Sequence, residues 1–186
     1  ASLAEVSWKA GETATALRFA DEAVAVYEQS GAGDDPDRFA QGLELRGLLQ
    51  ASTGRVREGR ADLEKALSER SRILGRTHPL VARTRVSIAK VNFADGLVDA
   101  ALAAALEAEQ DGRAHLLFTA RYLPERVALA YASRRPRGLD LALSIAATGG
   151  APEVLAVFDS AIRSRSVILD ELASRARSAA TDDPTV

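Results

Sequence analysis

The 186-residue sequence contains no cysteine and no methionine, and it has only two histidines and nine aromatic residues. Without cysteine this segment can form no disulfide, no thiolate metal site and no cysteine nucleophile. His78 and His115 offer little for imidazole chemistry, so we expect neither a metal nor a cofactor. No apolar run approaches the roughly 18 residues that a membrane span needs, and no signal peptide is visible. We therefore expect a cytoplasmic protein without membrane contact.

Alanine and leucine are abundant, with 37 and 23 copies. Both favour helices, whereas the β-branched residues are comparatively few, so composition predicts an all-α fold. The chain is 47% hydrophobic, which is enough for a core of one domain or two small ones. A formal net charge of −2 argues against general attraction to nucleic acid or anionic membranes. Because the chain starts at Ala1 and lacks methionine, we expect it to be a piece of a longer protein.

An internal repeat organises the chain. Gly11, Gly54, Gly96 and Gly138 are separated by 43, 42 and 42 residues. Other small or apolar residues share this spacing, in the pairs Gly47 and Ala89, Gly59 and Ala101, Leu63 and Ala105, and Ala66 and Ala108. A period of this length is typical of stacked helical hairpins, and small residues mark the points where two helices cross closely.

The second unit shows the pattern most clearly. Asp34 and Asp35 are N-cap candidates before Pro36, a first helix extends to about Ser52, Gly54 turns the chain, and Gly75 ends the second helix, Val56–Leu74. In the other units we expect helices over 3–10 and 12–29, and over 79–94 and 97–109. One hairpin cannot bury its own apolar face, so neighbouring hairpins must stack into a solenoid.

These residues resemble the tetratricopeptide (TPR) repeat. The TPR pattern has a small residue in the first helix, a glycine at the turn, and two alanines that flank a bulky residue in the second helix. In this sequence these positions correspond to Gly47, Gly54, Gly59, Leu63 and Ala66, and then to Ala89, Gly96, Ala101, Ala105 and Ala108. The period looks like the kinesin-light-chain variety of about 42 residues, whose inter-repeat signature is similar to the segment 74–79. Gln50 and Asn92 replace the usual tyrosine, and Gly59 replaces alanine.

The last third has a narrower resemblance, carried by the runs 114–121, 125–131, 139–144 and 163–173. They look like the segment that follows the TPRs in bacterial TPR–CHAT proteins, in which a caspase-like cysteine peptidase comes next. The resemblance implies an effector domain in cis, beyond the C-terminal end of this segment. That peptidase would use a histidine and a cysteine, so its catalysis would lie outside this chain.

The predicted architecture is an all-α, right-handed TPR-like superhelix with a long C-terminal capping helix. Residues 1–110 form three hairpins, 111–151 a degenerate fourth helical unit, 152–178 the long helix and 179–186 a disordered tail. The long helix carries Leu155, Phe158, Ile162, Leu169, Leu172 and Ala176 at three- and four-residue steps. This pattern predicts one buried stripe, which either caps the last repeat or meets the missing domain.

Motifs for phosphate, calcium or nucleophilic chemistry are absent. Gly31-Ala32-Gly33 lacks a third glycine and precedes no Gly-Lys pair, and Asp34, Asp35 and Asp37 lack the spacing of a calcium loop. We expect His78 to close its turn by a local hydrogen bond, and His115 to be packed or half exposed.

Charge is uneven along the chain. Residues 1–111 hold 14 basic and 18 acidic side chains, whereas 112–178 hold 10 and 6. The densest basic run is Arg134-Arg135-Pro136-Arg137, which lacks interleaved aromatics for stacking on bases. This run favours a solvated loop. Two other interpretations stay open: a basic patch that contacts an acidic partner domain and, more weakly, a nucleic-acid contact.

The expected function is a non-catalytic scaffold or sensor that binds a protein or peptide and controls the attached effector; the alternative is a structural self-association module. In a TPR superhelix the first helix of each hairpin lines the concave face. Besides Glu5 and Lys9, this places there Trp8, Gln41, Glu44, Leu48, Ser52, Arg83, Val86, Lys90 and Phe93. We expect Phe93 to anchor a peptide, and Arg83 and Lys90 to hold an acidic group. The competing interpretation is that a preceding repeat covers Trp8 and the second helix covers Phe93.

Overall fold

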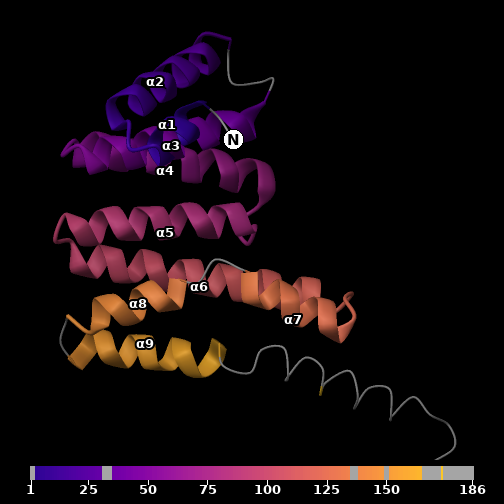
Figure 1. Ribbon diagram of the computed structural model, residues 1–186. Helices are drawn as coiled ribbons and strands as arrows, with labels where there is room; N and C mark the ends of the chain where they lie inside the picture. The colour runs from indigo at the N-terminus through magenta and orange to yellow at the C-terminus, as the bar shows by residue number, and fades with distance from the viewer. Residues whose placement is uncertain (1–2, 31–34, 135–137, 149–150, 165–172, 174–186) are drawn as a thin grey trace, which may run out of the picture.

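The computed structural model describes residues 3–30, 35–134, 138–148, 151–164 and 173, and every regular element in these ranges is an α-helix. The helices are α1 (Leu3–Lys9), α2 (Thr13–Ser30), α3 (Pro36–Ser52), α4 (Val56–Leu74), α5 (Pro79–Ala94), α6 (Val98–Ala120), α7 (Glu125–Arg134), α8 (Gly138–Ala146) and α9 (Ala151–Ser164). Figure 1 shows them stacked in layers along the molecule.

Successive helices pair into hairpins. α1 packs on α2, α3 on α4, and α5 on α6, while α2–α3 and α4–α5 contacts join one hairpin to the next. Each hairpin buries an apolar face against its neighbour; for example, Val24 of α2 lies in one cluster with Phe39 and Leu43 of α3 and Ala66 of α4. The predicted all-α stack of helical hairpins is therefore confirmed.

The turns between paired helices need glycine. Gly11, Gly54 and Gly96 have φ angles of 81°, 87° and 76°, a left-handed conformation that only glycine adopts without strain. Gly75, with φ of 82°, ends α4 as expected. At the start of α3, the Asp35 side chain accepts a hydrogen bond from the backbone N–H of Arg38 at 3.1 Å, before a proline in the first turn.

Gly138 differs from the other three glycines although it shares their spacing. It is not among the positive-φ glycines, and it is buried at the start of α8. A Cβ atom there would overlap the backbone carbonyl of Ala105 in α6. Gly138 therefore serves a close helix crossing, and the 42-residue spacing to Gly96 does not mark a fourth hairpin turn.

The predicted crossing of small residues lies between α3 and α4. A Cβ atom on Gly47 would approach the carbonyl oxygen of Gly59 to 2.6 Å, and one on Gly59 would approach the carbonyl oxygen of Gly47 still more closely. Farther along the same hairpin, Ala66 is fully buried with Phe39, Ala40 and Leu43. At Gly47 and Gly59 a larger side chain has no space, because the backbones of α3 and α4 are in contact there.

The C-terminal third departs from the expected boundaries. The second helix of the third hairpin was expected to end near Glu109, but α6 continues to Ala120, so residue 110 falls inside a helix. Its extension packs Leu116 and Ala120 against Ala128 of α7. α8 packs against α6 and α9 packs against α8, so the stack continues through α8 rather than α7.

The stripe expected to be buried on the last helix is exposed in the described part of α9. Leu155, Phe158 and Ile162 are 70%, 62% and 57% exposed, whereas Val157 is buried with Ile145 of α8. α9 turns this other face inward. The remaining stripe positions, Leu169, Leu172 and Ala176, and the predicted tail 179–186 lie outside the described residues.

Glu109 helps to join these last helices. Its carboxylate is fully buried and accepts hydrogen bonds from the backbone N–H of Leu139 at 3.3 Å and from Ser164 Oγ at 2.7 Å. One side chain of α6 therefore contacts both the start of α8 and the end of α9. A buried carboxylate requires such partners, because leaving water without them is costly.

Candidate functional site

The residues predicted on the concave face are exposed, half-buried or buried in the structure. Gln41 and Ser52 of α3 and Arg83 and Lys90 of α5 are exposed, while Leu48 and Val86 are half-buried. The Ser52 hydroxyl donates to the carbonyl of Leu49 within its own helix. The exposed members of this predicted surface are therefore polar, and the two on α5 are basic.

Glu44 was expected in the groove, but the structure places it between helices. Its side chain is 8% exposed and pairs with Arg70 Nη1 of α4 at 2.5 Å and with Arg83 Nη2 of α5 at 3.0 Å. Ser87 Oγ donates to the second carboxylate oxygen at 3.0 Å. Arg70 is 1% exposed and also donates to Thr84 Oγ1 at 2.6 Å. Glu44 thus balances a buried arginine and is not available to a ligand.

The two aromatic residues of the predicted site, Trp8 and Phe93, are only partly accessible. Trp8 is 38% exposed on α1. Phe93 is half-buried against a cluster that includes Ala89, Ala101 and Leu102. The packing of Phe93 against α6 supports the interpretation that the second helix covers it, at least in part. Arg83 and Lys90 are the more accessible members of this surface.

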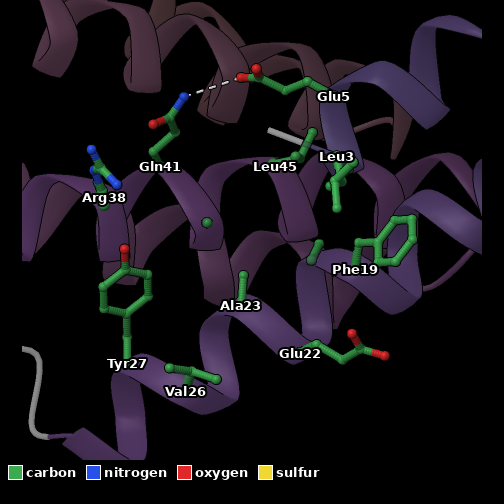
Figure 2. Close-up of a pocket in the computed structure, with 13 residues that line it drawn as sticks. Leu3, Glu5, Phe19, Glu22, Ala23, Val26, Tyr27, Arg38, Gln41 and Leu45 are labelled. Carbon is green, nitrogen blue, oxygen red and sulfur yellow. Dashed lines mark hydrogen bonds between the residues drawn. The ribbon is translucent and has the colours of Figure 1, made fainter. Parts of the chain in front are cut away.

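A cleft lies at the N-terminal end of the stack, between α1, α2 and α3. It has a volume of about 730 Å³. Figure 2 shows Ala23, Val26 and Tyr27 of α2 on one side and Arg38 and Gln41 of α3 on the other. Leu3, Phe19 and Leu45 also line it. At its edge, Gln41 Nε2 donates to Glu5 Oε1 at 3.1 Å. We call it the N-terminal cleft.

The repeat pattern gives no sign of this cleft, because it marks Ala23 as a packed position. Ala23 lies 43 residues before Ala66, which lies 42 before Ala108, so the three share one position of the repeat. Ala66 and Ala108 are fully buried, but Ala23 is exposed. A small residue placed for helix packing and left exposed indicates an unfilled position.

The two histidines lie together. His78 Nδ1 accepts a hydrogen bond from the backbone N–H of Leu80 at 3.2 Å, as predicted. His115 is half-buried between the rings of His78 and Tyr131, with ring centroids 6.1 and 6.0 Å away. Burial and then the neighbouring charge of His78 lower the pKa of His115. Across the residues that the structure describes, no three metal-binding side chains converge.

The Arg-rich run falls largely outside the described residues. Arg134 ends α7, and Arg135, Pro136 and Arg137 are not described. Two of the exposed aromatics of this third, Phe118 and Tyr122, pack edge-on near the end of α6, with ring centroids 6.0 Å apart. Among the described helices, none is long and apolar enough to span a bilayer.

Known structures share the fold. No family model matches the chain, and no curated protein matches its sequence. A kinesin light chain-like protein from Podosopora anserina, with nearly identical TPR-like repeats, is 19% identical with a TM-score of 0.55; the alignment covers 97% of this chain and 94% of that one. BtubC (BKLC) from P. vanneervenii is 17% identical with a TM-score of 0.50, over 97% and 79%. The chain therefore has a TPR-like superhelical fold.

Proposed function

We propose that the chain is a non-catalytic scaffold or sensor segment that binds a protein or peptide on its concave face. The observation that carries this proposal is the exposed basic end of that face. Arg83 is half-exposed and Lys90 is exposed, and Lys90 makes no ion pair within the described part of the chain. Lys90 therefore offers an acidic group on a ligand a positive charge that no described side chain pairs with, whereas Arg83 also pairs with Glu44.

The proposed binding surface comprises the remaining predicted residues. Gln41 and Ser52 supply exposed polar groups, and Lys90 with Arg83 supplies positive charge. Trp8, Leu48, Val86 and Phe93 offer partly exposed apolar surface, which we propose to lie along the same face. A few aromatic or aliphatic contacts within a polar rim are typical of peptide recognition.

The test is a selection of displayed acidic peptides against the chain, followed by affinity measurements on variants. We expect Lys90→Glu to weaken the selected peptides about ten-fold, or 1.4 kcal/mol. Phe93→Ala should weaken them similarly, with its thermal melt measured to detect any loss of packing. Arg57→Glu reverses an exposed charge on α4 and serves as the control. Equal affinities for wild type and Lys90→Glu would contradict the proposal.

For the intact protein, we propose that ligand binding controls an attached effector, by resemblance a CHAT peptidase, in the bacterial cytoplasm. This effector would follow Val186 in cis. The open reading frame downstream should then encode an α/β domain bearing a histidine and a cysteine. Peptidase activity of that full-length protein should respond to the selected peptides, and Lys90→Glu should remove the response. The chain alone should cleave no substrate in a peptidase panel.

Self-association is a second candidate because α9 exposes a row of apolar residues. Val154, Leu155, Phe158 and Ile162 lie on one side of the helix and are at least half exposed. Exposed rows of this kind often mark interfaces. Light scattering coupled to size exclusion separates the candidates: a dimer that Phe158→Asp converts to a monomer supports self-association, whereas a monomer at all concentrations argues against it.

A further inference from the structure

The two histidines of the chain lie where three helices meet. His78 directly precedes α5, His115 lies in α6, and Tyr131 lies in α7. The ring centroids of His78 and His115 are 6.1 Å apart, and those of His115 and Tyr131 are 6.0 Å apart. We call these three residues the histidine joint. Because the chain has no cysteine, its two histidines are the only side chains with an ordinary pKa between about pH 5.5 and 7.5.

The start of α5 requires the neutral form of His78. The Nδ1 atom of His78 accepts a hydrogen bond from the backbone N–H of Leu80 at 3.2 Å. A ring nitrogen that accepts a hydrogen bond carries no proton, whereas both nitrogens of an imidazolium are donors. A positive charge at this position would also face the positive end of the helix dipole. Protonation of both ring nitrogens of His78 therefore removes the cap of α5.

His115 favours its neutral form because it is half-buried. It lies between the rings of His78 and Tyr131, and burial lowers its pKa, with a second contribution from the charge of His78. Two imidazolium rings with centroids 6.1 Å apart would also repel each other. Taking up protons at the histidine joint is therefore unfavourable while the three rings are packed together.

The charged groups around the histidine joint are mostly positive. Asp111, one turn before His115 on α6, accepts a hydrogen bond from Arg85 Nε of α5 at 3.0 Å. Glu125 and Arg126, at the start of α7, are exposed. A carboxylate acting on His115 would raise its pKa, whereas the pKa is lowered. Within four residues of the three joint members along the chain, the charged residues are Arg76, Asp111, Arg113, Arg134 and Arg135.

α7 is the helix that the histidine joint connects to the stack. Its described contacts are chiefly with α6, where Ala128 packs against Leu116 and Ala120. Tyr131 belongs to the same small cluster and also contacts the ring of His115. By contrast, α3 and α5 each pack against helices on two sides. A helix with few buried apolar contacts opens locally at a lower free energy than the core does.

We propose that the histidine joint is a pH-sensitive switch, which holds α7 against α6 at neutral pH and releases it as the pH falls below about 6.5, while the central hairpins stay folded. Release exposes His115 to water, so the released state binds the proton more readily than the packed state does. The packed state therefore has its full stability above about pH 6.5 and loses it on acidification. The switch shares no residue with the proposed concave-face site, so the two proposals stand or fall separately.

Hydrogen–deuterium exchange of the full 186-residue chain at pH 7.5 and 5.5 measures the release. The rates are corrected for the intrinsic pH dependence of amide exchange. We expect the protection of α7 to fall about three- to ten-fold at pH 5.5, because one histidine of ordinary pKa accounts for at most about eleven-fold at that pH. α3 is the internal control, and its corrected protection should be the same at both pH values.

Two substitutions remove a titrating group and keep its packing or capping role. His115→Phe keeps a ring between His78 and Tyr131 and should make the protection of α7 equal at the two pH values. His78→Asp keeps an N-cap acceptor for the N–H of Leu80 and places a negative charge beside His115, so acid should no longer release α7. Tyr131→Phe keeps the ring and both histidines, and as the matched control it should retain the wild-type response. Thermal melts at pH 7.5 show whether each variant is folded.

Three results would overturn the inference. The first is equal protection of α7 at both pH values in the wild-type chain. The second is an acid response that persists in folded His115→Phe or in folded His78→Asp; if one of these variants does not fold, the other decides. The third is a parallel loss of protection in α3, because acid would then unfold the chain as a whole and not release one helix.

Discussion

The central hairpins, α3–α4 and α5–α6, differ from the terminal helices α7–α9 in how they use polar and apolar side chains. The central crossing is made by Gly47 and Gly59, and the buried Glu44–Arg70 pair joins three helices. In α9 the large apolar residues Leu155, Phe158 and Ile162 are exposed. Each central hairpin packs against described helices on both sides, whereas α9 packs mainly against α8 and α6, and stability in a repeat protein depends on such neighbour contacts.

The largest expected effect concerns the buried ion pair. Glu44→Ala leaves Arg70 without its closest carboxylate at 1% exposure, and we expect a loss of about 3 to 5 kcal/mol in unfolding free energy. Urea denaturation measures it. Glu64→Ala, at an exposed position of α4, is the control and should change stability by less than about 0.5 kcal/mol. Similar values for the two variants would show that the pair contributes little.

The next effect compares equivalent alanines in two hairpins. Ala66→Leu inserts three carbons into a fully packed position and should cost about 1 to 3 kcal/mol. Ala23→Leu makes the same change at the exposed equivalent and should alter stability by less than about 0.5 kcal/mol. Thermal melts of both proteins test this difference. An unchanged melt for Ala66→Leu would mean that the repeat alignment is misplaced.

A smaller effect distinguishes the two faces of α9. Val157→Ala removes buried contacts with the cluster around Ile145 and should cost about 1 to 2 kcal/mol. Phe158→Ser removes a larger side chain that is 62% exposed and should change stability by less than about 0.5 kcal/mol. If Phe158→Ser proves the more destabilising in chemical denaturation, the outward face of α9 is covered in solution.

The smallest effect depends on pH. The pKa of His115 is lowered in the folded state, so the unfolded chain binds this proton more readily. The stabilising contribution of neutral His115 is therefore complete above about pH 6.5 and decreases as the pH falls below that value. Melts of wild type and His115→Gln between pH 7.5 and 5.5 should show a steeper decline for wild type. A steeper decline in the variant would reverse the assigned sign.

Much of the fold could be predicted because each hairpin contains residues with known local preferences for turns and helix starts. Gly11, Gly54 and Gly96 mark turns that need positive φ, and Asp35 and Pro36 mark a helix start. Gly138 shows the limit of this approach. It shares the 42-residue spacing, but its function is a close contact with the backbone of Ala105, which no local pattern reveals.

The candidate site could be predicted less completely than the fold. The register of the TPR resemblance predicted Gln41, Ser52, Arg83 and Lys90 on the concave face, and all four are exposed. It also placed Glu44 there, because periodicity specifies the direction of a side chain only to within about one neighbour on the helix surface. Whether that neighbour is solvent or Arg70 of another helix depends on the distance between hairpins.

The sequence by itself determined the helices and turns of the first two hairpins and the period of the repeat, because these depend on residues within one hairpin. Only the tertiary structure decided which surfaces remain open. The exposed face of α9 and the cleft beside Ala23 both exist because a helix surface is buried only where another helix lies against it. The same alanine is a core residue at position 66 and a cleft residue at position 23, since its environment is set by the neighbouring helix and not by its own segment.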